Sequence, residues 1–284
     1  MQLEAELLEP LRKPFLKWAG SKTRLVKALR PLLPLDKKRY VEPFVGAGAL
    51  FLNTNYPKSL LSDTNLDLFQ LYTILKGEKE KFIKTCRKLF VKENNRSEAF
   101  YEFRKEFNKA KDPERRAALF VYLNRHGYNG LCRYNQSGEF NVPFGTYNKI
   151  YFPEAEMLGF AERLQTAELK HQDFRKTFGT ITKEDAVYCD PPYVPLSKTS
   201  NFTSYAAGGF SATDQRELAE LCYLSSQHGA VVIISNHDTP GARKLYQQAE
   251  SLRFESVSRT ISCNGENRKQ AKELIAVFQK HVPI

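Results

Sequence analysis

The chain alternates between short apolar runs and longer amphipathic stretches. Five apolar runs predict buried strands, at residues 40–45, 59–61, 186–189, 231–235 and 274–278. Helical patterns separate most of them, and Ser211-Ala-Thr-Asp214 has the residues of a capped helix start. Because strands that alternate with helices form βαβ units, the pattern predicts an α/β fold, an open and mainly parallel sheet with helices on both faces.

The pattern changes between Asp63 and Ala186, where no clear sheet strand is visible. Amphipathic helical patterns lie near residues 78–91, 97–108 and 113–126. Asp112 and Pro113 open the last of these as N-cap and first-turn proline. Residues 127–150 mix glycine and asparagine with aromatics, which predicts a loop or hairpin. We therefore expect residues 64–150 to form a helical and hairpin insertion into an α/β domain made of residues 1–63 and 151–284.

The charge is concentrated in that insertion. The 284-residue chain has globular composition, with 42% hydrophobic and 26% charged residues, and a net charge of +11. Residues 64–150 contain 17 Lys and Arg against 10 Asp and Glu. A basic surface favours a polyanionic partner because it releases the counterions of phosphates, but charge alone does not name that partner.

The cysteines and the apolar content exclude several classes of protein. The five cysteines are widely spread and form no Cys-x-x-Cys pair: Cys86, Cys132, Cys189, Cys222 and Cys263. They predict reduced thiols rather than disulfides, and no cluster has the spacing of metal ligands. No run of about 18 apolar residues occurs, so we expect no membrane span and a protein that stays where it is made.

A glycine turn follows the first predicted strand. In Val41-Glu-Pro-Phe-Val-Gly46-Ala-Gly48, the glycines let the backbone turn tightly and approach a ligand. Asp63 ends the next apolar run, seventeen positions after Gly46, close to where nucleotide-binding folds place the acid that binds ribose hydroxyls. An adenosine-containing cofactor is therefore expected. The alternatives are a structural turn and an Asp63 that caps the following helix.

A second motif, Asp190-Pro191-Pro192-Tyr193, follows the predicted strand at 186–189. Two prolines remove two backbone donors and restrict the preceding residue, so the Asp190 carboxylate and the Pro191 carbonyl are fixed acceptors. Two acceptors on the hydrogens of a ring amine favour its tetrahedral, nucleophilic form. The Tyr193 ring offers a stacking surface for the ring that carries this amine.

With these motifs the chain resembles the Dam-type DNA adenine methyltransferases of the alpha group. The match runs from Pro14-Phe-Leu-Lys-Trp-Ala-Gly-Ser-Lys22 through both motifs to Ile234-Ser-Asn-His-Asp238. The resemblance implies a Rossmann-like methyltransferase sheet and the cofactor S-adenosyl-L-methionine, contacted by Trp18, Lys22, Asp63 and Asp190. Phe44, Gly46 and Gly48 would form the pocket. Ser21 stands where many members have glycine.

The resemblance also assigns the stretch from Asn124 to Tyr134. It implies guanine readout by Arg133, contact of Lys17 with the first guanine, and intercalation by Tyr128, with further DNA contacts from Asn129 and Leu131. A planar Arg can bind guanine O6 and N7 together. Without the resemblance, Arg133 would be interpreted as a solvated surface charge. His237 would lie near the pocket by analogy, and a structural role is equally open.

The expected function is N6 methylation of a flipped adenine in GATC, within double-stranded DNA, by a monomeric cytoplasmic protein associated with the nucleoid. A second possibility is methylation of another planar amine, such as cytosine N4 or a protein glutamine. Those relatives often carry Ser or Asn in place of Asp190, and the basic insertion argues against a peptide. A third is a catalytically silent DNA-binding regulator, against which the intact motifs weigh.

Overall fold

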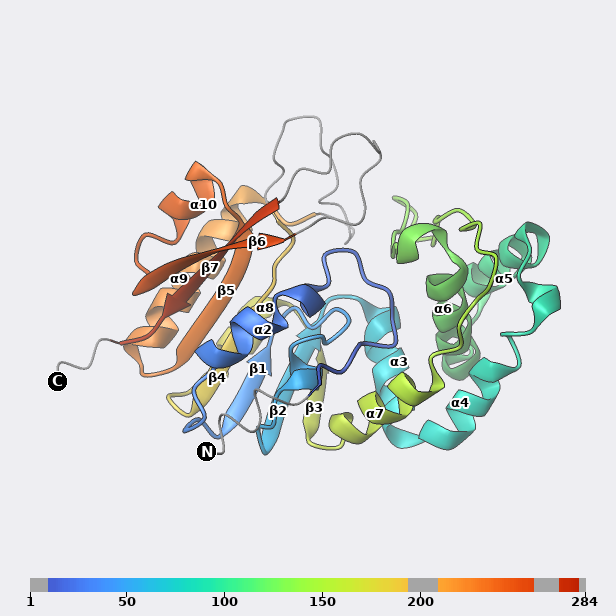
Figure 1. Cartoon of the computed structure of the whole chain (residues 1–284), viewed down its shortest axis with the longest axis horizontal. Helices are drawn as coiled ribbons and strands as arrows, with labels where there is room; N and C mark the ends of the chain where they lie inside the picture. Colours follow the sequence, from blue (N-terminus) through green and yellow to red (C-terminus); the bar gives the residue numbers. More distant parts are fainter. Residues whose placement is uncertain (1–9, 194–208, 258–270, 281–284) are drawn as a thin grey trace.

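The structure, a computed structural model, describes residues 10–193, 209–257 and 271–280 (Figure 1). Seven strands form one sheet in the order β3-β2-β1-β4-β5-β7-β6. Their bounds are β1 Arg39–Glu42, β2 Lys58–Asp63, β3 Ala167–His171, β4 Asp185–Cys189, β5 Val231–His237, β6 Ser251–Val257 and β7 Ala271–Phe278. The first five strands in that order pair in parallel, and β7 and β6 are antiparallel.

The strand order reverses between β1 and β4. From β1 the chain proceeds outward through β2 to β3, and then returns to β4 on the other side of β1 and continues to β5. In open α/β sheets, ligands bind outside the carboxyl ends of the strands where the order reverses in this way. The glycine turn follows β1 and Asp190 follows β4, so both motifs lie at this point.

The fold class and all five strands predicted from the sequence are confirmed, but two strands were missed. The expectation that no strand interrupts residues 64–185 is wrong, because β3 lies at 167–171. This edge strand is largely exposed and carries charges at Glu168 and Lys170, so it lacks the apolar run of a buried strand. The edge strand β6 is likewise half-exposed, with Phe254 49% exposed.

Nine described α-helices accompany the sheet. They are α2 Val26–Leu29, α3 Leu66–Gly77, α4 Lys79–Arg87, α5 Ser97–Lys109, α6 Pro113–His126, α7 Glu154–Leu164, α8 Phe174–Phe178, α9 Ala212–Gln227 and α10 Pro240–Leu245. Short 3-10 helices cover Lys22–Arg24, Arg30–Leu32, Phe51–Asn53, Lys92–Asn94 and Tyr128–Gly130. Within the described part of the chain, no helix combines the length and apolarity needed to cross a membrane.

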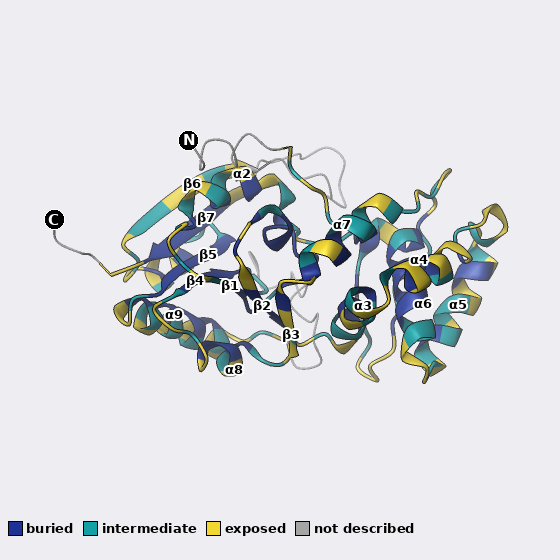
Figure 2. Ribbon diagram, turned by 90° about the horizontal axis from the view of Figure 1, so that it is seen from below, coloured by how far each residue is buried: buried dark blue, intermediate teal, exposed yellow. Residues whose placement is uncertain are grey.

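The sheet is buried on both faces. Tyr40 belongs to the hydrophobic cluster that includes α2, whereas its neighbour Val41 belongs to the cluster that includes α8 and α9. Successive residues of a strand point to opposite faces, which explains the division. Figure 2 shows the dark blue strands between α2 on one side and α8 and α9 on the other.

Helices α3 to α6 form a lobe beside the β3 end of the sheet (Figure 1). The predicted caps are confirmed: Asp112 accepts from the backbone N–H of Arg115 at the start of α6, and Ser211 and Asp214 form a capping box on α9. Nine of the fourteen residues of α6 are buried, so this helix is the centre of the lobe.

Candidate active site

The glycine turn after β1 brings Trp18 and Asp63 together. Gly46 and Gly48 have φ of 45° and 65°, which L side chains rarely adopt. A Cβ on Gly46 would lie 2.8 Å from Trp18 Nε1, so the indole packs directly on the glycine. The backbone N–H of Gly46 donates to Asp63 Oδ2 over 3.0 Å. The turn therefore needs glycine both for its conformation and for the close approach of the indole.

Asp63 does not cap the helix that follows it, so that alternative is wrong. The N-cap of α3 is Asn65, whose side chain accepts from the backbone N–H of Leu68 over 3.0 Å. Asp63 Oδ1 instead accepts from the backbone N–H of Asn65 over 2.9 Å. Burial raises the pKa of Asp63, and the hydrogen bonds from Asn65 and Gly46 act in the opposite direction. The carboxylate is thus oriented by the backbone at the end of β2.

Asp190 is paired with a lysine from the N-terminal loop. Lys22 Nζ lies 2.8 Å from Asp190 Oδ1, and Ser235 Oγ donates to the same oxygen over 3.2 Å. Lys22 is 8% exposed and also donates to the carbonyl of Gly20 over 2.6 Å. Burial raises the pKa of the Asp190 carboxyl, while the Lys22 ammonium lowers it. The ion pair therefore favours the ionised, acceptor form of Asp190.

The rest of the Asp190 motif is fastened to neighbouring elements. Gln215 of α9 donates to the carbonyl of Pro192 over 2.7 Å. The Tyr193 hydroxyl donates to Glu273 Oε2 of β7 over 2.8 Å, and His237 packs edge-on against the ring at 4.4 Å between centroids. Lys22 Nζ lies 4.4 Å from the Tyr193 ring centroid. Three contacts therefore hold the tyrosine side chain.

The structure does not bring Phe44 into the group around Trp18. Its ring stacks on Phe174 at 5.6 Å between centroids and meets Phe210 edge-on at 5.7 Å. These rings belong to the α8 and α9 side of the sheet. Phe44 thus lines the other side of the turn from the indole.

Glu42, at the end of β1, is a further candidate site residue, which was not predicted from the sequence. It is 3% exposed and accepts from the Tyr40 hydroxyl over 3.0 Å. Burial is the main cause that raises its pKa well above the usual range, and the carboxylates of Asp190 and Asp63 add to it. A glutamate inside an apolar strand, directly before the glycine turn, was the signal that could have found it.

Four of the five predicted DNA-contacting residues lie after the end of α6, in the hairpin segment, which we define as residues 127–150, and the fifth, Lys17, lies in the N-terminal loop. Tyr128 is 46% exposed and Arg133 is exposed. Arg133 Nε donates to Asn141 Oδ1 over 2.8 Å, so the guanidinium rests on the returning part of the segment. Asn129 has φ 53°, a left-handed conformation, and Leu131 is half-buried.

Lys17 joins the hairpin segment to the N-terminal loop. Its backbone N–H donates to Asn124 Oδ1 over 2.9 Å, and Asn124 Nδ2 donates back to its carbonyl over 2.6 Å. Lys17 Nζ donates to the carbonyl of Arg125 over 3.1 Å and lies 3.8 Å from the Tyr147 ring centroid. Burial, together with Arg125, lowers the pKa of Lys17 to about 8. The next residue along the loop is Trp18, so one short loop serves both groups.

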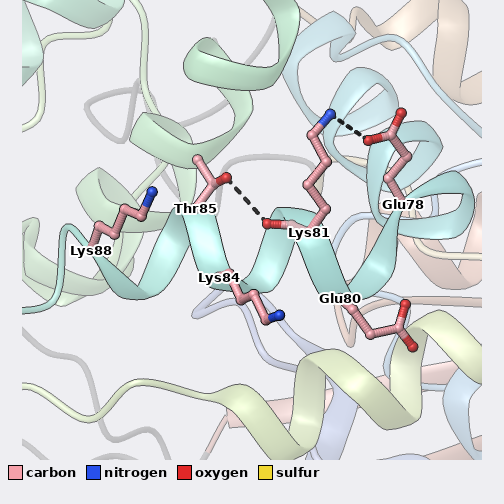
Figure 3. A pocket seen from close by; sticks show the side chains of 6 residues that line it. All are labelled: Glu78, Glu80, Lys81, Lys84, Thr85 and Lys88. Atoms are coloured by element: carbon pink, nitrogen blue, oxygen red, sulfur yellow. Dashed lines mark hydrogen bonds and ion pairs between the residues drawn. The ribbon is translucent and has the colours of Figure 1, made fainter.

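Two further features lie apart from this chemistry. A hollow of about 650 Å³ on α4 is lined by Glu78, Glu80, Lys81, Lys84, Thr85 and Lys88 (Figure 3). None of these is a candidate site residue, and Lys81 forms an ion pair with Glu78 within the lining. Among the described residues, no group of three or more His, Cys, Asp or Glu side chains could hold a metal ion.

The four described cysteines, Cys86, Cys132, Cys189 and Cys222, are free and buried, as predicted for reduced thiols. Cys263 lies outside the described residues. Burial raises the pKa of the Cys132 thiol to about 12. The Cys132 thiol is therefore a protonated packing group.

Comparisons with known proteins identify the family of the chain. The D12 class N6 adenine-specific DNA methyltransferase family matches residues 18–261. A DNA adenine methylase of Escherichia coli K12 is 48% identical over 270 residues, covering 95% of this chain and 96% of the relative. One of Serratia marcescens is 49% identical over 268 residues, covering 94% and 98%.

Solved structures add little to this. A precorrin-6y C5,15-methyltransferase from Geobacter metallireducens is 7% identical with a TM-score of 0.38, covering 90% of this chain and 87% of that one. A TM-score this low supports no conclusion about the fold beyond the observed strand order. The family match spans most of the chain, and the relatives are nearly half identical along almost their whole length. The chain therefore belongs to the D12 class of N6 adenine-specific DNA methyltransferases.

Proposed function

We propose that this DNA adenine methyltransferase transfers the methyl group of S-adenosyl-L-methionine to the N6 amine of adenine in GATC, within double-stranded DNA. One observation supports it most strongly. The Lys22–Asp190 ion pair and the Trp18–Gly46–Asp63 group stand where β4 and β1 end, at the reversal of strand order. A carboxylate suited to ribose and an acceptor suited to a ring amine thus meet at one edge.

The residues present fit an adenosine-containing methyl donor. Each oxygen of Asp63 accepts one backbone hydrogen bond and can accept another from a ribose hydroxyl. The partly buried indole of Trp18 supplies apolar surface beside the turn. When bound, the donor supplies an electrophilic methyl group on a sulfonium. Trp18, Lys22, Asp63 and the turn of Gly46 and Gly48 would hold it.

Asp190 prepares the amine for attack. The adenine lone pair is delocalised into the ring, and hydrogen bonds from N6–H to the Asp190 carboxylate and the Pro191 carbonyl favour the tetrahedral amine. The Lys22 ammonium opposes the effect of burial and favours the ionised form of Asp190, which can accept. The Tyr193 ring, held by Glu273 and His237, stacks on the flipped base. No covalent enzyme intermediate is needed.

DNA choice is assigned to the insertion, residues 64–150, which carries most of the basic excess, and to Lys17 of the N-terminal loop. Its positive charge supports affinity for any duplex, whereas Lys17 and Arg133 would read guanines. The exposed Tyr128 would fill the gap left by the flipped adenine, and Asn129 and Leu131 would contact the neighbouring bases. We propose that one chain acts alone on one site.

The test uses a labelled methyl donor and a panel of short duplexes. One duplex contains GATC, and the others carry single base-pair substitutions in it. The proposal predicts incorporation into the GATC duplex, recovery of the label as N6-methyladenine, and large losses for each substitution. Equal labelling of all duplexes would contradict the GATC assignment, and DNA binding without labelling would favour a silent regulator.

A further inference from the structure

The residues on either side of Arg133 point away from it. Cys132 is buried and Tyr134 is partly buried, whereas Arg133 is exposed. Tyr134 forms an antiparallel bridge with Phe140, and Asn141 donates from its backbone N–H to the carbonyl of Arg133 over 3.1 Å. In such extended backbone successive side chains point to opposite sides. The two inward side chains therefore determine where Arg133 stands.

Both inward side chains contact the first turn of α3. The Tyr134 hydroxyl donates to Asp67 Oδ2 over 2.6 Å. Asn65 Nδ2 donates to Cys132 Sγ over 3.6 Å. This turn directly follows Asp63, whose Oδ1 accepts from the backbone of Asn65. One turn of helix thus lies between the end of β2 and the two residues that flank Arg133.

Asp67 is a rigid acceptor for that tyrosine. It is 7% exposed, and Arg116 of α6 binds both of its oxygens, from Nε over 2.5 Å and from Nη2 over 3.1 Å. Arg116 in turn donates to the carbonyl of Phe107 over 2.7 Å and stacks on that ring at 4.1 Å. Hydrogen bonds to an ionised acceptor are shorter and stronger than neutral ones. The carboxylate is therefore fixed by two helices before it receives Tyr134.

We propose that Asp67 and Tyr134 are positioning residues that set the sequence specificity of this methyltransferase by holding Arg133 at the height of the guanine edge. The inference rests on the proposed role of Arg133. Bidentate contact with guanine O6 and N7 requires the planar guanidinium in one position, so a small displacement of its backbone costs discrimination more than it costs binding. Neither Asp67 nor Tyr134 needs to touch DNA for this.

The test is Tyr134→Phe, which removes the hydroxyl and keeps the ring that packs edge-on against Phe140. Activity (kcat/KM) is measured on the GATC duplex and on one with the guanine pair read by Arg133 substituted. We expect the ratio of the two to fall about tenfold, the effect of losing about 1.4 kcal/mol. Cofactor affinity without DNA should stay unchanged. Tyr101→Phe, on the exposed face of α5, is the matched control.

A second variant guards against a general effect on folding. Asn65→Ser keeps an oxygen that can cap α3 and loses the amide that reaches Cys132. It should reduce the ratio by less than Tyr134→Phe, with the thermal midpoint close to wild type. An unchanged ratio in Tyr134→Phe, or equal slowing on both duplexes, would overturn the inference. If Arg133→Ala loses discrimination while Tyr134→Phe keeps it, the proposed function stands and only this inference fails.

Discussion

The carboxyl edge of the sheet and the hairpin segment hold their polar groups in opposite ways. At the sheet edge the charged groups are themselves shielded and locked together, as in the Lys22–Asp190 pair, where the side chains are 9% and 21% exposed. In the hairpin segment the charged group is exposed, and its neighbours Cys132 and Tyr134 are the anchored ones. The first arrangement fixes reacting groups, and the second presents a reader to a partner.

The chain therefore carries out catalysis and DNA sequence recognition with two differently built regions. A shielded carboxylate with a fixed cation can accept a hydrogen bond without reorganising. Such preorganised groups stabilise a transition state. The exposed guanidinium of Arg133 stays hydrated in the free protein and therefore carries little desolvation cost. Its direction is set by the anchored neighbours Cys132 and Tyr134. Changes at the sheet edge should therefore affect every DNA sequence alike, whereas changes in the hairpin segment should depend on sequence.

The largest effect is expected for Asp190→Ala. Methyl transfer should fall on the order of 10³-fold on all duplexes, as expected when a preorganised hydrogen-bonding group is removed from a transition state. The fold should be retained with a lower thermal midpoint, because the shielded Lys22 loses its counterion and keeps only its bond to the Gly20 carbonyl. Labelled methyl incorporation and thermal unfolding measure the two. The exposed Glu184→Ala is the control, and near wild-type turnover would remove Asp190 from the mechanism.

Next is Asp63→Ala, which should weaken cofactor binding at every DNA sequence. Losing hydrogen bonds from a desolvated ribose should cost on the order of 1 to 3 kcal/mol. Isothermal titration of the cofactor without DNA measures this directly. Asn65→Ser is the control for the local structure, because it alters the same turn but leaves Asp63 in place to bind the cofactor. Unchanged affinity in Asp63→Ala would mean that the carboxylate only orders the backbone.

Arg133→Ala should have an effect in the hairpin segment that depends on the DNA sequence. It should lose about 1 to 3 kcal/mol of discrimination at one guanine–cytosine pair, with far smaller effects on a duplex already substituted there. Removal of a phosphate-contacting lysine should instead weaken binding to every sequence and reduce its salt dependence. Rates on matched duplexes at several salt concentrations distinguish the two. Equal slowing at all sites would mean that Arg133 helps to hold the duplex and does not read a base.

The smallest effect concerns pH. Because the pKa of Lys17 is lowered to about 8, its ammonium loses its proton as the pH rises from 7 to 9. Affinity for GATC should then fall, by at most about tenfold if the contact contributes about 1.4 kcal/mol. Binding isotherms across this range measure the effect. Lys17→Arg, which stays charged, should flatten the profile, and an equal decline in that variant would assign the pH dependence to another group.

The sequence predicted those parts of the site whose geometry is local. Gly46 and Asp63 were found because a glycine turn and an acid at the next strand end form one local unit, whose parts were then seen to bond. Asn65 as the helix cap was missed, since Asp63 two residues earlier has an equally suitable side chain.

Contacts between distant segments were beyond such reasoning. No spacing rule joins Lys22 to Asp190, 168 positions apart, and the resemblance supplied only their shared site. The bond between Asp67 and Tyr134 likewise depends on how the lobe packs beside the sheet. The edge strand β3 was missed because its charged, exposed residues give no apolar run. Tertiary packing determined each of these features.

The most direct test is to express the chain in cells whose DNA contains no methylated adenine and to map N6-methyladenine by sequencing. We expect modified adenines to lie in GATC on both strands, and we expect the Asp190→Ala chain to leave the DNA unmodified. Modification at a different sequence would contradict the assignment of the hairpin segment. Absence of N6-methyladenine with the intact chain, under conditions where it is expressed and folded, would contradict the proposed function itself.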